Sequence, residues 1–247
     1  MNTAQIILAD KVFRLNNLIN GIDTEPKIPL YHGSSNMIVN PTYGYGQDKH
    51  DYGAGFYTTL DIELAREWAV CNGNEIGYLH KFVLDTVGLS ILDFNSRYSV
   101  LTWLATLSKH RSAANSKLTR RNEQLLIDKY YDSEIENYDI IIGYRADDSF
   151  FSFAKKAIRG EIDISLLDEI MRKGDLGYQV FIQSENAFKA LKKVDDNTHG
   201  YSEIVDSKVY REKYDYRDAK ARNEVAYLVE SDKNTLNDTI EKYIGLR

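Results

Sequence analysis

The sequence predicts an α+β protein with a central β-sheet and flanking helices. Short β-prone segments and longer amphipathic segments both occur, but the lengths between them are irregular. Regular strand–helix–strand alternation, which is typical of a doubly wound parallel sheet, is absent. We see no internal repeat and no linker-like shift in composition, so the 247 residues are expected to form one domain.

The N-terminal half is expected to start with a helix and to continue mainly as strands. Residues 1–25 carry apolar side chains at roughly helical spacing. Strands are predicted at 30–34, 56–59, 77–85 and 89–94, the last two as a pair. A loop rich in glycine, asparagine and tyrosine joins the first two strands. Asp61 can cap a following helix, one face of which carries Leu64, Ala65, Trp68 and Ala69.

The C-terminal half alternates helices with two further strands. The strands are predicted at 138–144 and 178–183. Helices are predicted at 96–110, 120–135, 146–160, 166–174 with Ser165 as its cap, and 185–191 starting at Ser184. The tail from about residue 201 is charged and helical in pattern. The expected organisation is a core at about 28–195 and a mostly helical extension at 200–247.

Composition and charge limit the function classes. No apolar run approaches the roughly 18–20 residues that a membrane-spanning helix needs, and the N-terminus does not resemble a signal peptide. The single cysteine, Cys71, excludes an internal disulfide framework and indicates a reducing, cytoplasmic location. We expect Cys71 to be a passive residue on a helix face.

A net charge of −6 gives no global attraction for nucleic acid, but one segment is locally basic. Residues 108–121 contain no acidic residue, and two interpretations stay open: a solvated loop between helices, or a patch for a phosphate-bearing partner. The basic residues of this segment are Lys109, His110, Arg111, Lys117, Arg120 and Arg121.

Several familiar chemistries lack their motifs. The sequence has neither the glycine-rich dinucleotide fingerprint nor a P-loop, and it has no G-x-S-x-G nucleophile elbow. The five histidines are too scattered for a zinc site, so no metal is expected. Loop glycines, aromatic residues and one histidine at a strand end remain. Such a set suits a flat aromatic ligand held by stacking and backbone hydrogen bonds.

Four segments in order resemble a known family. "LYHGS" at 30–34 and "DYGAGFYTT" at 51–59, followed by "AREWA", are similar to the His-Tyr-Glu class of ADP-ribosyltransferases, the branch of diphtheria toxin and the poly-ADP-ribose polymerases. "YDIIIGYRADD" at 138–148 and "YQVFIQSENAFKAL" at 178–191 extend the likeness to a bacterial family of uncharacterised domains with that fold. The resemblance implies a split central sheet and covers about residues 29–194.

The resemblance also implies that NAD⁺ is bound as a substrate. His32 would hydrogen-bond a ribose, the backbone of Gly33 would hold the nicotinamide amide, and Tyr57 would stack on the nicotinamide ring. Tyr45 or Tyr52 would form a second wall, and Ser34 would assist at a ribose hydroxyl. Gly53 and Gly55 would shape the loop before strand 56–59, whose neighbours Phe56 and Tyr57 point to opposite faces. The implied NAD⁺-binding residues are Tyr31, His32, Gly33, Ser34, Tyr45, Gly55, Phe56 and Tyr57.

The third catalytic element departs from the class pattern. The class places a glutamate at the start of a late strand, and the matching position here is Gln179. Glutamine can donate and accept hydrogen bonds, but it cannot offset positive charge as a carboxylate does. Asp147 and Asp148, in a loop after a buried strand, are candidates for the missing acid–base group, and Glu185 is a weaker one. The candidate catalytic residues are His32, Tyr57, Gln179, Asp147 and Asp148.

The expected function is therefore mono-ADP-ribosyl transfer from NAD⁺ to a macromolecular acceptor, either a protein or a nucleic acid. Two alternatives stay open: a non-catalytic module that binds NAD⁺ or ADP-ribose, and an NAD⁺ glycohydrolase. By analogy with the family, the protein could serve as a toxin or in phage defence. That role would bring an antitoxin or another regulator as a partner.

Overall fold

The computed structural model describes residues 26–37, 40–112, 114–146, 148–173, 178–194, 201–231 and 239–246. Its strands are β1 (Lys27–Ser34), β2 (Phe56–Thr59), β3 (Ile76–Asp85), β4 (Ile91–Asp93), β5 (Ile140–Tyr144), β6 (Tyr178–Ile182), β7 (Leu191–Lys193) and β8 (Glu203–Asp206). They form one eight-stranded sheet in the order β4-β5-β6-β2-β1-β3-β7, with β8 also paired to β3. Only β4 and β5 pair in parallel, so the sheet is mixed. The predicted α+β class is confirmed.

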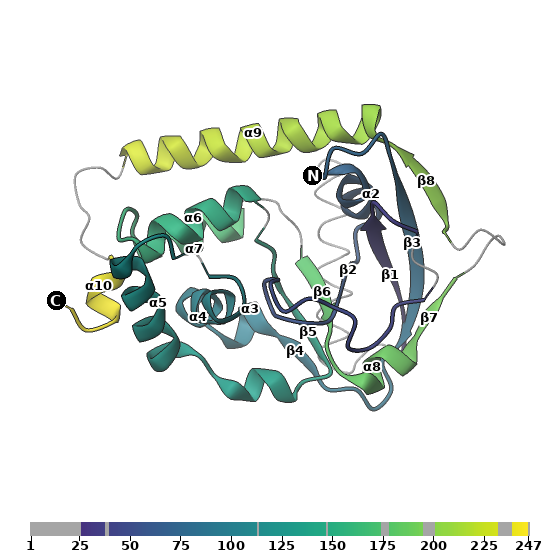
Figure 1. Ribbon diagram of the computed structural model, residues 1–247, viewed down its shortest axis with the longest axis horizontal. Helices are drawn as coiled ribbons and strands as arrows, with labels where there is room; N and C mark the ends of the chain where they lie inside the picture. The colour runs from purple at the N-terminus through teal and green to yellow at the C-terminus, as the bar shows by residue number, and fades with distance from the viewer. Residues whose placement is uncertain are drawn as a thin grey trace.

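Helices cover the two halves of the sheet separately (Figure 1). They are α2 (Ile62–Val70), α3 (Phe94–Arg97), α4 (Val100–His110), α5 (Lys117–Tyr130), the 3₁₀ helix η1 (Ser133–Asn137), α6 (Asp148–Ile158), α7 (Ile164–Lys173), α8 (Glu185–Ala190), α9 (Ser207–Ser231) and α10 (Ile240–Tyr243). One hydrophobic cluster joins α3, α4, α6 and α7 to Ile141 and Phe181 of the sheet. A smaller cluster joins α2 to β3 and β8. The long helix α9 contacts both α2 and the pair α6 and α7.

The sheet opens between β1 and β2. These strands share one registered pair, Tyr31 with Thr59, whereas β1 and β3 are paired along the whole of β1. The end of β1 and the start of β2 therefore diverge. Divergent strand ends leave room for a ligand between them.

Helix α2 lies unusually close to the sheet because two glycines face it. A Cβ atom added to Gly33 of β1 would lie 1.8 Å from the carbonyl oxygen of Ala65. One added to Gly77 of β3 would lie 2.1 Å from that of Ala69. The predicted cap is confirmed: the Asp61 carboxylate accepts a hydrogen bond from the Glu63 N–H at 3.0 Å. The face of α2 that carries small residues thus contacts the sheet directly.

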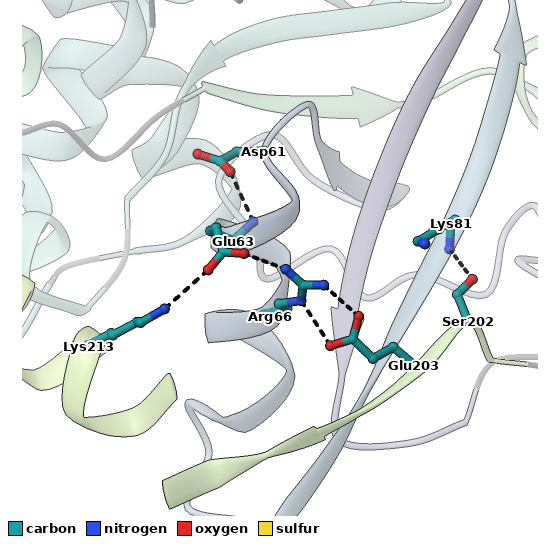
Figure 2. A network of polar contacts seen from close by, with 7 residues as sticks. All are labelled: Asp61, Glu63, Arg66, Lys81, Ser202, Glu203 and Lys213. Atoms are coloured by element: carbon teal, nitrogen blue, oxygen red, sulfur yellow. Dashed lines mark hydrogen bonds and ion pairs between the residues drawn. The ribbon is translucent and has the colours of Figure 1, made fainter. Parts of the chain in front are cut away.

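An ion-pair network joins α2 to β8 and α9 (Figure 2). Arg66 of α2 binds the Glu203 carboxylate of β8 through two bonds, Nε to Oε1 at 3.0 Å and Nη2 to Oε2 at 2.6 Å. Arg66 also pairs with Glu63, which in turn accepts from Lys213 of α9 at 3.3 Å. Bidentate arginine–carboxylate pairs fix geometry as well as adding energy. The network therefore fixes α2 against β8 and adds one exposed ion pair between α2 and α9.

Three element predictions are wrong, each for a physical reason. Segment 89–94 does not pair with 77–85: β4 pairs in parallel with β5 at the far edge of the sheet, and such long-range pairing leaves no local pattern. Ser165 does not cap its helix, because α7 already begins at Ile164. The predicted helix 96–110 is divided, since the side chain of Ser99 caps a new helix, α4.

Most other boundaries agree with the prediction to within a few residues. The structure adds the strands β7 and β8, and the predicted helix 120–135 ends at Tyr130 and is followed by η1. Strand β2 has the predicted bounds, and Ser184 caps α8 by accepting from the Ala187 N–H. The tail begins with a strand, β8, before it becomes helical. The helix predicted within residues 1–25 lies outside the described residues. Among the helices that the structure describes, none has both the length and the apolar character that crossing a membrane requires.

Candidate functional site

A cavity of about 340 Å³ lies between α2, β2, β6 and the segment after β5. We call it the charged cavity, because its lining includes Asp51, Arg111 and Arg145. Gly33, Tyr57 and Gln179 line it as well, from three neighbouring strands of the sheet. Its remaining lining residues are His50, Trp68, Cys71, Asn72, Ala146 and Tyr214. Its volume is within the range of small-molecule sites.

Gln179 and Asp51 are hydrogen-bonded to each other at the wall of this cavity. Gln179 is 3% exposed, and its Nε2 donates to Asp51 Oδ2 at 3.1 Å and to the Tyr144 carbonyl oxygen at 2.9 Å. The same Oδ2 accepts from the Ala146 N–H at 2.7 Å. Burial raises the pKa of Asp51, while the Ala146 N–H, Arg111, Gln179 and Arg145 oppose that rise. A buried carboxylate with several donors is thus fixed beside the amide.

Two arginines bring positive charge to the same cavity. Arg111 Nη1 lies 3.4 Å from Asp51 Oδ1 and donates to the Ala146 carbonyl at 2.9 Å. The guanidinium of Arg145, a buried residue, lies over the Trp68 indole, 4.9 Å from the ring centroid. Guanidinium groups recognise phosphate oxygens and stack on aromatic rings. The cavity therefore combines cations with aromatic surface, as a nucleotide site requires.

Tyr57 contributes its ring to the cavity and uses its hydroxyl to hold the preceding loop. The hydroxyl donates to the Gly53 carbonyl at 2.8 Å and accepts from the Tyr52 N–H at 3.0 Å. Gly53 has a φ of 96°, which favours glycine. Burial raises the pKa of Tyr57 well above its usual range, so the phenol stays protonated. The hydroxyl thereby fixes the loop that places Asp51 at the cavity wall.

His32 bridges the opening between β1 and β2 on the opposite face of the sheet. Its Nδ1 lies 2.6 Å from the Tyr57 carbonyl oxygen, and its ring stacks against Phe56 at 4.6 Å. Burial lowers the pKa of His32 to about 4, so the ring is neutral at pH 7. A carbonyl only accepts, so Nδ1 carries the proton. Nε2 is then a hydrogen-bond acceptor.

The other predicted binding residues line a second, separate cavity of about 580 Å³. Ser34, Gly55 and Phe56 line it together with Tyr45, which is 87% exposed. Its lining has no ionisable side chain apart from that tyrosine, so we call it the neutral cavity. Of the neighbours Gly33 and Ser34, the first lines the charged cavity and the second lines the neutral cavity. Tyr57 and Phe56 are divided in the same way. The predicted division of Phe56 and Tyr57 between two faces is thus confirmed.

The remaining candidates lie elsewhere. Tyr31 packs with Ile62 and Tyr210 beside α2, and Tyr52 is buried against Phe94 and Phe181. Gly55, which lines the neutral cavity, also has a packing role, because an added Cβ would lie 2.3 Å from the Phe181 ring. Glu185 lies at the first position of α8 and forms an ion pair with Lys189. Asp147 and the side chain of Asp148 are outside the described part of the chain.

Nine residues that line the charged cavity received no role in the NAD⁺ site from the sequence, and four of them show why. Arg145 directly follows a buried strand. Asp147 became a candidate because it was predicted in the loop after that same strand, and the same reasoning applies to Arg145. Asp51 lies within the resembling motif, but no role was assigned to it. Trp68 has the spacing of a core helix face, which does not distinguish a cavity wall from a core. Tyr214, on α9, gives no sequence signal.

Half of the basic segment is paired within the protein. Lys109 binds Glu136 at 2.8 Å, His110 binds Asp48 at 2.8 Å, and Arg111 faces Asp51. Lys117, Arg120 and Arg121 are exposed at the start of α5. In the described ranges, no group of three or more His, Cys, Asp or Glu side chains is placed to hold a metal ion.

One family model matches the chain, over residues 28–193, and its description is "Protein of unknown function (DUF3990)". Since the match covers more than half of the 247 residues, the chain belongs to the DUF3990 family. No curated protein and no solved structure gives a significant match. Every residue that lines the charged cavity lies within the matched range except Tyr214.

Proposed function

We propose that the protein is a mono-ADP-ribosyltransferase that binds the nicotinamide end of NAD⁺ in the charged cavity. One observation carries the proposal: Gly33, Tyr57 and Gln179 come from three distant segments and line the same cavity. These are the segments whose sequences resemble ADP-ribosyltransferases. A cavity of this size fits a nicotinamide riboside unit.

The contents of the cavity support a nucleotide that carries both an aromatic ring and phosphates. Tyr57 and Trp68 offer ring surface, and stacking on one base is worth about 1–3 kcal/mol. Arg145 lies against Trp68 and brings a guanidinium within reach of a diphosphate. The buried indole N–H of Trp68 has no acceptor among the described residues.

The adenosine half of NAD⁺ would occupy the neutral cavity. The two cavities lie on opposite faces of the sheet beside the opening between β1 and β2, since adjacent residues of each strand line different cavities. NAD⁺ would therefore have to extend through this opening. Neutral His32 bridges the opening, and its Nε2 can accept a hydrogen bond from a ribose hydroxyl. Ser34 and Tyr45 offer hydroxyls on the neutral side.

Transfer requires the glycosidic bond between C1′ of the ribose and the nicotinamide nitrogen to break. Nicotinamide leaves with the bonding electron pair, and positive charge develops on the ribose. The acceptor then attacks C1′ and loses a proton. The protein's part is to hold the ribose in place and to stabilise the developing charge electrostatically. The partial pairing of the basic segment favours a protein acceptor over a nucleic acid.

The test uses NAD⁺ labelled on the adenylate phosphate, a bacterial lysate, and the full-length protein. Wild type should transfer label to macromolecules, and protease or nuclease treatment should identify the acceptor. Trp68→Ala should transfer roughly 5- to 150-fold less label, because it loses a stacking surface worth about 1–3 kcal/mol. Tyr216→Ala is the matched control, since Tyr216 lies 74% exposed on α9.

The outcomes separate the three candidate activities. Label in macromolecules that depends on Trp68 supports the transferase. Free ADP-ribose without labelled acceptor would support a glycohydrolase. NAD⁺ that is bound but intact would contradict both enzymes and leave a binding module.

A further inference from the structure

The contacts of Gln179 fix which end of its amide can meet a ligand. Its Nε2 is 3.1 Å from a carboxylate oxygen of Asp51 and 2.9 Å from the Tyr144 carbonyl. Both partners accept hydrogen bonds, so both amide hydrogens are used. The carbonyl oxygen Oε1 remains to accept a hydrogen bond in the cavity. A glutamate at this position would present the same kind of acceptor with a negative charge.

We infer that Asp51 is the carboxylate of this site, acting through Gln179 as a positioning residue. It would hold the amide so that Oε1 receives a ribose hydroxyl, and it would supply the negative charge that glutamine lacks. This inference rests on the proposed function. In the ADP-ribosyltransferases that the sequence resembles, a single glutamate both accepts the ribose hydroxyl and supplies the negative charge. Here Gln179 of β6 would do the first and Asp51 of the loop before β2 the second.

The surroundings of Asp51 suit that role. The residue is 6% exposed and lines the charged cavity, so water screens its charge little. Its Oδ2 accepts from both the Ala146 N–H and Gln179 Nε2, and its Oδ1 faces Arg111 at 3.4 Å. These donors favour the ionised form, but burial outweighs them and leaves the pKa of Asp51 above its usual value. Tyr57 fixes the loop through the Gly53 carbonyl and the Tyr52 N–H.

Exchanging the two groups tests the inference. We would measure nicotinamide release and NAD⁺ affinity for wild type, Asp51→Asn, Gln179→Glu and the double variant. Asp51→Asn should lower kcat by on the order of 100-fold, as expected for one lost electrostatic group, with NAD⁺ affinity changed less than about 3-fold. The double variant restores a carboxylate–amide pair in reversed order. Its kcat should return to within about 10-fold of wild type, because the charge is again present.

Gln179→Glu alone sets two carboxylates side by side, and these should share a proton. Its activity should therefore rise only at higher pH than that of wild type. Asp48→Asn is the matched control: it removes the same charge from the same loop, but the Asp48 side chain is 75% exposed and pairs with His110. That variant should keep wild-type kcat.

The outcomes distinguish this inference from the proposed function. Wild type that releases no nicotinamide overturns both. Active wild type with an equally active Asp51→Asn, or with a folded double variant that is no better than Asp51→Asn, overturns the inference alone. If Asp51→Asn does not fold, the pH profile of wild type decides. Its kcat should fall on acidification as Asp51 becomes protonated, and a flat profile down to pH 4 would overturn the role.

Discussion

The two cavities at the open ends of β1 and β2 differ in their chemistry although they are built from adjacent residues. The charged cavity brings together a buried carboxylate, two arginines and an amide, whereas the neutral cavity offers mainly loop residues and aromatic surface. Alternation along a strand explains the division, since neighbours point to opposite faces. Under the proposed function, bond cleavage would take place in the charged cavity, and the neutral cavity would only bind.

The largest expected effect comes from removing the close approach of α2 that shapes the charged cavity. Gly33→Ala should destabilise the fold by about 3 kcal/mol or more, because its Cβ would lie 1.8 Å from the Ala65 carbonyl oxygen and backbone must move. Urea unfolding measures this loss. Gly44→Ala, where nothing lies within 4 Å of an added Cβ, should cost only about 1 kcal/mol for its φ of 77°. Equal costs would contradict the packing argument.

Acid should lower the free energy of unfolding through His32, the residue that bridges β1 and β2. The pKa of His32 is lowered to about 4 in the folded protein from its ordinary value of 6.5, so the unfolded chain binds more protons between those pH values. Stability therefore falls as pH drops from 6.5 to 4, by up to about 3 kcal/mol. His32→Asn keeps a donor toward the Tyr57 carbonyl and should remove this pH dependence from unfolding curves. His50→Asn is the control and should retain it.

Charge removal from the charged cavity should weaken NAD⁺ binding selectively. Arg145→Met keeps an extended side chain against Trp68 but deletes the guanidinium, and calorimetry should show an affinity loss of roughly 10-fold or more. Binding of uncharged nicotinamide should be unaffected. Arg97→Met is matched to it, because Arg97 also lies over an aromatic ring, that of Tyr98 at 5.6 Å, but lines neither cavity. Similar losses in both variants would rule out a specific role for Arg145.

The smallest effect is expected in the neutral cavity. Tyr45→Ala should weaken NAD⁺ binding by about 5-fold or less, because the side chain is 87% exposed and contributes a partly solvated contact. Its kcat should equal that of wild type. A fall in kcat without a change in affinity would mean that chemistry extends into the neutral cavity.

The parts of the fold that depend on local sequence were predictable. The Asp61 cap, the bounds of β2 and the Ser184 cap follow from residue types at short range. The parallel pairing of β4 with β5 was not, because it joins segments about 50 residues apart without a local signature. Tyr214 is a further example, since α9 is far from the other lining residues in sequence and comes beside the cavity through its tertiary contacts with α2.

The candidate site was predictable as a set of motifs but not as a geometry. Gly33, Tyr57 and Gln179 were identified in order along the chain, and the structure places them around one cavity. From sequence, His32 was expected in the same group. Its side chain lies instead on the opposite face of the sheet, where Nδ1 bonds the Tyr57 backbone carbonyl. Asp51 could not be recognised as the partner of Gln179 from sequence, because the two are 128 residues apart.

A crystal structure with a hydrolysis-resistant NAD⁺ analogue is the most direct test of the proposed binding site. We predict the nicotinamide ring between Tyr57 and Trp68 in the charged cavity, its amide at the Gly33 backbone, and the adenosine in the neutral cavity. A nicotinamide ring in the neutral cavity, or an analogue bound away from both cavities, would contradict it.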